Sequence, residues 1–311
     1  MESISSLPYM AYTVDESALW LEQLKTEGFA VVGGVASKSQ VEEGRHLLWE
    51  WLAGLGTGII REQPSTWQDT AWPDWPGMKK YGTCKSEGGA HKGATWYLRG
   101  LPSLKKVFAS IYGTEELLVS MDGMILWRPW HEIPSRKPGS SRLHVDQNPS
   151  TKPGFHCVQG MLPLYAVEPE TGGTVVVPRS HEKQECLLAR NKDWNTLNRD
   201  YCVLSEDDPL QGEEVLVPLQ PGDLLVWDSR LVHAGTVGEG KEVEELARAS
   251  LCVCMGPRER ATEEVLRKRK EAIIQGWSFS HWPWEARGTL GQVTQNNTLH
   301  CDLSQEQLQL V

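Results

Sequence analysis

The feature that most restricts the fold of this chain is a run of short strands in its second half. Alternating or continuous apolar residues form each strand, and turn residues separate the strands. A parallel doubly wound sheet needs a helix after nearly every strand, and that alternation is missing. The pattern predicts a double-sheet sandwich or jelly roll with strands in the regions 117–130, 155–168, 174–182, 213–236 and 247–255.

Helices are expected on both sides of this strand-rich region. Apolar residues at helical spacing predict helices at 16–26, 38–54, 103–113 and 261–276. Residues 56–99 are rich in Gly, Pro and Trp, and an irregular segment of this length inside a domain is typically a functional cover. No linker or repeat divides the chain, so we expect one mainly β domain with flanking helices over residues 1–311, with core strands at about 117–255.

Two metal-ligating side chains stand one residue apart within the strand-rich region. His144 and Asp146 lie in LHVDQNP, and positions i and i+2 of an extended chain point to the same face. A third candidate, His233, follows an apolar strand in LLVWDSRLVHAG. Two histidines and one carboxylate with open positions are the ligand set of non-haem Fe(II) oxygenases. For either histidine alone, the alternative is a hydrogen-bonded core residue.

Charge, hydropathy and cysteine content argue against several classes of protein. The net charge is −10, so we expect no nucleic-acid partner. No apolar stretch reaches the roughly 18 residues of a membrane-spanning helix, and we expect no secretory leader and no membrane association. Seven cysteines without framework spacing indicate reduced thiols, which favours a cytoplasmic location. We expect a monomer or weak homo-oligomer.

The irregular segment 56–99 has a basic half. Between residues 77 and 99, five Lys and Arg side chains stand against one acidic residue, Glu87, in a chain that is acidic overall. We interpret this half as an electropositive lid for an anionic substrate, with a solvated basic loop as the alternative. The residues that we expect to contact substrate here are Lys79, Lys80, His91, Trp96 and Arg99.

The sequence resembles the phytanoyl-CoA dioxygenase-like branch of the Fe(II)/2-oxoglutarate-dependent oxygenases. The resemblance extends from about residue 27 to residue 255 and is strongest in LHVDQNP, CVQGMLPLYAVEPETGGTVVVPRSH and PGDLLVWDSRLVHAG. It implies a double-stranded β-helix core of the jelly-roll or cupin type, with iron bound by His144, Asp146 and His233. It also implies that Arg248, with Ser250, binds the far carboxylate of 2-oxoglutarate through paired hydrogen bonds.

The same resemblance implies an enzyme that uses Fe(II), 2-oxoglutarate and O₂ and releases succinate and CO₂. Hydroxylation of an unactivated C–H bond is the expected reaction, and oxidative cyclisation or desaturation uses the same oxidant. The basic segment indicates a small, carboxylate-bearing metabolite, with Asn148 and Gln159 as further contacts. The alternatives are a β-sandwich binding or regulatory protein without catalysis, and a cupin-type enzyme that uses another metal without 2-oxoglutarate.

Overall fold

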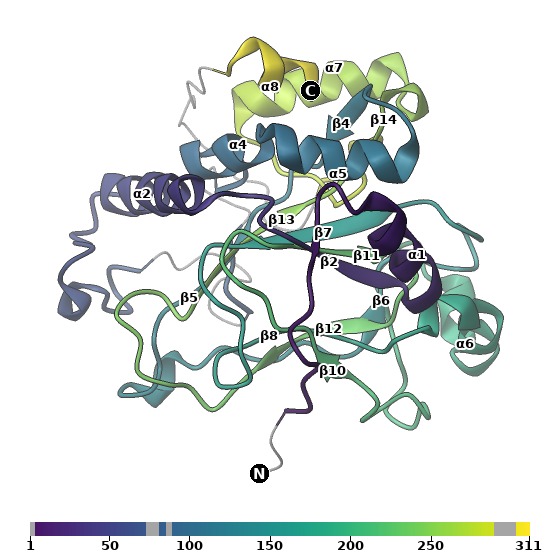
Figure 1. The fold of residues 1–311 in the computed structure, drawn as a ribbon, viewed down its shortest axis with the longest axis horizontal. Helices are drawn as coiled ribbons and strands as arrows, with labels where there is room; N and C mark the ends of the chain where they lie inside the picture. The colour runs from purple at the N-terminus through teal and green to yellow at the C-terminus, as the bar shows by residue number, and fades with distance from the viewer. Residues whose placement is uncertain (1–3, 73–80, 85–88, 289–302) are drawn as a thin grey trace.

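Two β-sheets face each other, and helices cover the outer side of the larger sheet (Figure 1). The computed structural model describes residues 4–72, 81–84, 89–288 and 303–311. The seven-stranded sheet has the order β1 (Tyr12–Thr13), β2 (Phe29–Gly33), β11 (Leu224–Asp228), β7 (Val158–Pro163), β13 (Arg248–Val253), β5 (Met124–Trp127) and β3 (Thr83–Cys84). The five-stranded sheet has the order β10 (Val215–Leu216), β8 (Gly172–Val176), β12 (His233–Val237), β6 (His144–Val145) and β9 (Cys202–Val203).

Successive strands cross between the two sheets, which is the connectivity of a double-stranded β-helix. From β5 to β13 the chain passes from the large sheet to β6, back to β7, across to β8 and β10, and then through β11, β12 and β13. Paired strands within this core are antiparallel. The predicted fold class, mainly β with flanking helices around a jelly-roll core, is confirmed.

One predicted strand is wrong in detail. The region 117–130 divides into β4 (Leu117–Val119), which pairs with β14 (Met255–Pro257), and β5, which joins the seven-stranded sheet. Between them, the backbone N–H of Ser120 donates to the carbonyl of Cys254, and the carbonyl of Asp122 accepts from Arg99. Residues 120 and 122 form these hydrogen bonds instead of the regular backbone pairing of a continuous strand, so the predicted strand is interrupted there.

The large sheet is apolar on both faces because each face covers a separate core. On β2, Ala30 and Val32 belong to the core beneath the helices, whereas Phe29 and Val31 belong to the core between the sheets. The strands β7 and β11 divide their side chains in the same way. Strands buried on both faces read as continuous apolar runs, as this region of the sequence does.

The predicted helices are present within a few residues of their expected limits. The helices are α1 (Ser17–Glu27), α2 (Lys38–Gly54), α4 (Gly93–Arg99), α5 (Pro102–Tyr112), α6 (Gln184–Arg190), α7 (Glu263–Gln275) and α8 (Gln305–Gln309). A capping box formed by Ser37 and Gln40 begins α2, and Gly28 in the left-handed conformation ends α1. None of the described helices is both long and apolar enough to span a lipid bilayer.

The helix α4 lies in the segment that was expected to be irregular. Its seven residues begin with Gly93, and its buried side chains pack against α2 and α5. A helix this short is stabilised by tertiary packing more than by its own propensity, so its sequence carries little signal. Short 3₁₀ turns lie at Pro64–Thr66, Gly89–His91, Pro134–Arg136, Ser180–Lys183, Lys192–Thr196 and Arg258–Arg260.

A fully buried arginine on α7 joins the carboxyl-terminal segments to the rest of the fold. Arg269 is 0% exposed and donates to the carbonyl groups of Val119, Pro283, Leu310 and Val311. The bond to Pro283 attaches residues 280–288, called here the carboxyl-terminal strap, to α7. The strap matters for function because it lines the main cavity.

Candidate active site

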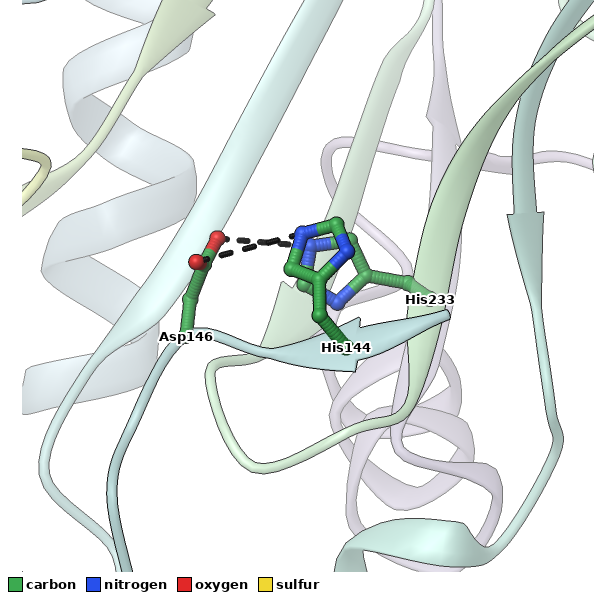
Figure 2. A group of neighbouring side chains, drawn as sticks. All are labelled: His144, Asp146 and His233. Carbon is green, nitrogen blue, oxygen red and sulfur yellow. Dashed lines mark ion pairs between the residues drawn. The ribbon is translucent and has the colours of Figure 1, made fainter. Parts of the chain in front are cut away.

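Three metal-ligating side chains meet between β6 and β12 of the five-stranded sheet (Figure 2). His144 and His233 are directly opposite each other in the antiparallel register, and their ring centroids lie 4.4 Å apart. Asp146 follows β6 and faces both rings: its Oδ1 is 3.9 Å from His144 Nε2, and its Oδ2 is 3.4 Å from His233 Nε2. Within the described part of the chain, this is the group of three such residues close enough to share a metal ion.

The backbone determines which nitrogen of each ring faces Asp146. His144 Nδ1 is 2.7 Å from the carbonyl of Arg142, and His233 Nδ1 is 2.9 Å from the carbonyl of Leu231. Because a carbonyl only accepts, each Nδ1 carries a proton, and each Nε2 is the nitrogen that faces Asp146. Both rings are therefore oriented to offer Nε2 to a metal ion.

The ionisation states of these residues suit a metal ion. Burial lowers the pKa of His144 to about 4, and the proximity of His233 adds to the effect. Burial would raise the pKa of Asp146, but the interactions with His144 and His233 outweigh it and hold that pKa well below its usual range. Two imidazoles and one carboxylate form a donor set that fits Fe(II).

A buried arginine faces the same space from the seven-stranded sheet. Arg248 begins β13 and is 2% exposed; its Nη2 lies 2.8 Å from Met161 Sδ, and its guanidinium lies 4.5 Å from the ring centroid of Trp127. Ser250 Oγ lies 3.4 Å from Arg248 Nε. Among the described residues, the hydrogen-bond partners of its side chain are Ser250, Met161 and Thr174, none of them charged, and burial lowers its pKa to about 10. An anionic ligand would stabilise a guanidinium in this position.

One cavity of about 670 Å³ contains both the His-Asp-His cluster and Arg248. Its wall is strongly aromatic, and two rings contact the metal-ligating histidines: Tyr201 lies 4.5 Å from His144, and Trp227 lies 5.3 Å from His233, between ring centroids. The other large aromatic residues of the wall are Tyr81, Trp127 and Trp282. A cavity of this size holds a drug-sized ligand, so a cosubstrate and a second small molecule fit together.

Comparison with known proteins identifies the family. The family model described as phytanoyl-CoA dioxygenase (PhyH) matches residues 24–237, which is more than half of the chain. The chain belongs to the phytanoyl-CoA dioxygenase family. It is therefore an Fe(II)- and 2-oxoglutarate-dependent oxygenase, as the sequence resemblance predicted. The matched residues include the His-Asp-His cluster and end before Arg248.

Individual proteins resemble this oxygenase over most of its length. Ava biosynthesis cluster protein O of Aspergillus versicolor is 27% identical over 287 residues, which is 85% of each chain. A solved structure of a Salmonella typhimurium LT2 protein matches with a TM-score of 0.60 at 15% identity, covering 91% of this chain and 83% of that one. The non-haem α-ketoglutarate-dependent carbocyclase SnoK from nogalamycin biosynthesis matches with a TM-score of 0.50 at 18% identity, covering 79% and 87%. At these identities the structural matches show the fold.

Three residues predicted to contact substrate lie away from the cavity of the oxygenase. His91, Trp96 and Arg99 are at most 2% exposed, and none of them lines the cavity. Arg99 donates to the carbonyl groups of Ala90 and Asp122, and Trp96 Nε1 donates to His91 Nδ1 at 3.3 Å. The structure contradicts the prediction for these three residues: Trp96 and Arg99 lie on α4, His91 lies on the 3₁₀ turn before it, and all three side chains are buried in the protein interior.

The remaining predicted substrate contacts have different outcomes. Lys79 and Lys80 lie outside the described residues. Asn148 is fully buried, does not line the cavity, and donates to three backbone carbonyls of residues 194–199, so its role is structural and the prediction is wrong. Gln159 lines the cavity beside the His-Asp-His cluster.

Several polar residues of the cavity wall are absent from the sequence predictions. Arg199 and Asp200 come from a loop without regular pattern, and His281 and Arg287 come from the carboxyl-terminal strap. Tertiary structure alone brings these segments beside the metal-ligating cluster. One feature of the sequence could have indicated His281 and Arg287: the stretch SHWPWEAR is rich in aromatic and charged residues within an otherwise irregular region.

A network of ion pairs connects the strap to the turn that follows the metal-ligating residues. Lys152 Nζ lies 2.8 Å from a carboxylate oxygen of Asp200 and 2.8 Å from one of Glu285. Arg287 approaches the same two carboxylates at 3.8 Å and 3.2 Å. Lys152 also lies 3.7 Å from the ring centroid of Trp282. This wall of the cavity is therefore built by charge and aromatic contacts between three separate segments.

Proposed function

We propose that this oxygenase binds Fe(II) through His144, Asp146 and His233, binds 2-oxoglutarate through Arg248 with Ser250, and oxidises a C–H bond of a small molecule in the same cavity. The main support for the proposal is that the candidate iron ligands and the candidate cosubstrate-binding arginine line the same cavity. Three oriented ligands and a buried guanidinium, from strands of opposite sheets, face one cavity of about 670 Å³. A cupin enzyme without 2-oxoglutarate would have no use for a buried, cavity-facing Arg248.

Iron with 2-oxoglutarate and O₂ supplies an oxidant able to remove hydrogen from an unactivated C–H bond, with release of succinate and CO₂. The chain provides orientation and exclusion of water. The two Nδ1 hydrogen bonds hold the imidazoles of His144 and His233 in place, and Arg248 fixes one end of the cosubstrate. The aromatic wall around the metal-ligating residues limits the access of water to the reacting centre.

We propose a carboxylate-bearing substrate that is bound by arginines of the cavity wall. Lys152 lies nearer than Arg287 to both Asp200 and Glu285, so most N–H groups of Arg287 are available to a ligand. Arg199 also lines the cavity and has no ion pair among the described residues. An anionic group between these two arginines would leave the body of the substrate against the aromatic wall.

The reaction that we propose is hydroxylation, or oxidative cyclisation or desaturation, of a metabolite. The relative from Aspergillus versicolor is named for a biosynthesis cluster, and its similarity spans 85% of this chain, which supports a biosynthetic substrate. We also propose that residues 1–311 form one domain. One hydrophobic core includes residues from Trp20 to Val311, which supports that arrangement.

Succinate release tests the substrate proposal. The enzyme, Fe(II) and 2-oxoglutarate are incubated in air with paired compounds that differ only in a carboxylate or its amide. We expect succinate release with acids, and we expect Arg199→Met and Arg287→Met each to raise KM about tenfold, since one charge-assisted hydrogen bond contributes about 1.5 kcal/mol or more. Arg267→Met, at an exposed position on α7, is the control. Equal turnover of acids and amides, or unchanged KM in both variants, would contradict an anionic substrate.

A further inference from the structure

Gln159 is a neutral side chain that contacts a metal-ligating carboxylate. It lies on β7, directly opposite Trp227 of β11 in the antiparallel register, and is 7% exposed. Its Nε2 donates to Asp146 Oδ2 at 3.1 Å. Gln159 pairs with Trp227 of β11, and its neighbour Gly160 pairs with both β11 and β13, so the backbone next to Gln159 is held on both edges.

The same carboxylate is fixed at its backbone. The N–H of Asp146 donates to the carbonyl of Ser229 at 3.0 Å, so the freedom that remains is rotation of the side chain. The Asp146 oxygens lie within ion-pair or hydrogen-bond distance of His144, His233 and Gln159. Gln159 is therefore the one of these partners that does not itself offer a ligand to the metal.

The number of oxygens that Asp146 gives to the metal decides whether the chemistry is possible. A carboxylate binds a metal through one oxygen or through both. In an octahedral site with two imidazoles, a one-oxygen carboxylate leaves three positions, whereas a two-oxygen carboxylate leaves two. A chelating cosubstrate takes two positions, so only the one-oxygen arrangement keeps a position for O₂.

We propose that Gln159 is a positioning residue that holds Asp146 as a one-oxygen ligand. Its N–H engages Oδ2, which would leave Oδ1 as the oxygen available to bind the metal. The inference rests on the proposed iron site but does not depend on the identity of the substrate. It assigns Gln159 a role in orienting a metal ligand, in addition to its place in the cavity wall.

Counting water on bound Mn(II) tests this role without turnover. Mn(II) replaces iron, and line broadening of its electron paramagnetic resonance signal in ¹⁷O-enriched water reports the number of bound waters. The variants are Gln159→Leu and Gln159→Met, which are close to Gln in size and lack the N–H. Having two variants keeps the test valid if one fails to fold. The control is Gln184→Leu, which removes an amide hydrogen bond of 2.9 Å to the carbonyl of Arg230, away from the cavity.

We expect three bound waters in the parent and the control and two in both Gln159 variants, because the released Oδ2 takes one position. Three waters in the Gln159 variants would overturn the positioning role while leaving the proposed function intact. A parent that does not bind Mn(II), or whose binding is unchanged by Asp146→Ala, would overturn the proposed metal site and this inference with it.

Discussion

Arg248 is the residue whose surroundings most limit what the cavity can bind. It lies between a thioether and an indole, neither of which can neutralise its charge, and a serine hydroxyl is its nearest oxygen partner on the same strand. Removing a guanidinium from water without a counter-ion is costly, and a ligand carboxylate offsets that cost. Arg248 therefore provides a preformed anion-binding position at this end of the cavity.

Replacing Arg248 with Lys tests this assignment at the scale of one residue. The lysine keeps the charge but loses the planar pair of donors, so we expect 2-oxoglutarate to bind about 10- to 100-fold more weakly, a loss of about 1.5–3 kcal/mol. Anaerobic calorimetric titration of the Fe(II) enzyme measures it. Arg260→Lys, at a 3₁₀ turn outside the cavity, is the control. Unchanged affinity in Arg248→Lys would mean that the cosubstrate binds elsewhere.

The carboxyl-terminal strap is the element that sequence patterns describe least well, and the one that completes the cavity wall. It contains no helix and forms a single isolated bridge, between Phe279 and Gly288. Its position depends on the carbonyl contacts of Arg269 and on the ion pairs of Lys152 with Asp200 and Glu285. These three partly buried side chains are 11–19% exposed, so the pairs are screened less than ordinary surface pairs.

Lys152→Met should therefore loosen the strap. The change leaves two partly buried carboxylates without their nearest cation, and we expect it to lower the free energy of unfolding by about 1–3 kcal/mol and to raise the KM of the substrate. Urea unfolding measures the first effect and succinate release the second. Lys268→Met, which removes an exposed pair with Glu264 on α7, should leave both values unchanged. Equal effects in the two variants would show that the Lys152 pairs have no special role.

At the scale of the whole molecule, patterns that repeat along the chain were predictable and contacts between distant segments were not. The strands of the jelly roll follow from apolar runs, and His144 with Asp146 follows from the two-residue period of a strand. The direction in which Trp96 and Arg99 point depends on α4, a helix too short to have a clear period. The cavity wall formed by Arg199 and Arg287 depends on packing between segments 88 residues apart, which no local pattern encodes.

The measurement that tests the central claim most directly is an anaerobic titration of the metal-free protein with Fe(II) and then with 2-oxoglutarate. We predict a visible charge-transfer band from 2-oxoglutarate chelated to iron, present in the parent and absent in Asp146→Ala. Its appearance would place the metal and the cosubstrate at the His-Asp-His cluster. Absence of the band in the parent, with Fe(II) bound weakly or not at all, would contradict the assignment of His144, Asp146 and His233 as the iron site.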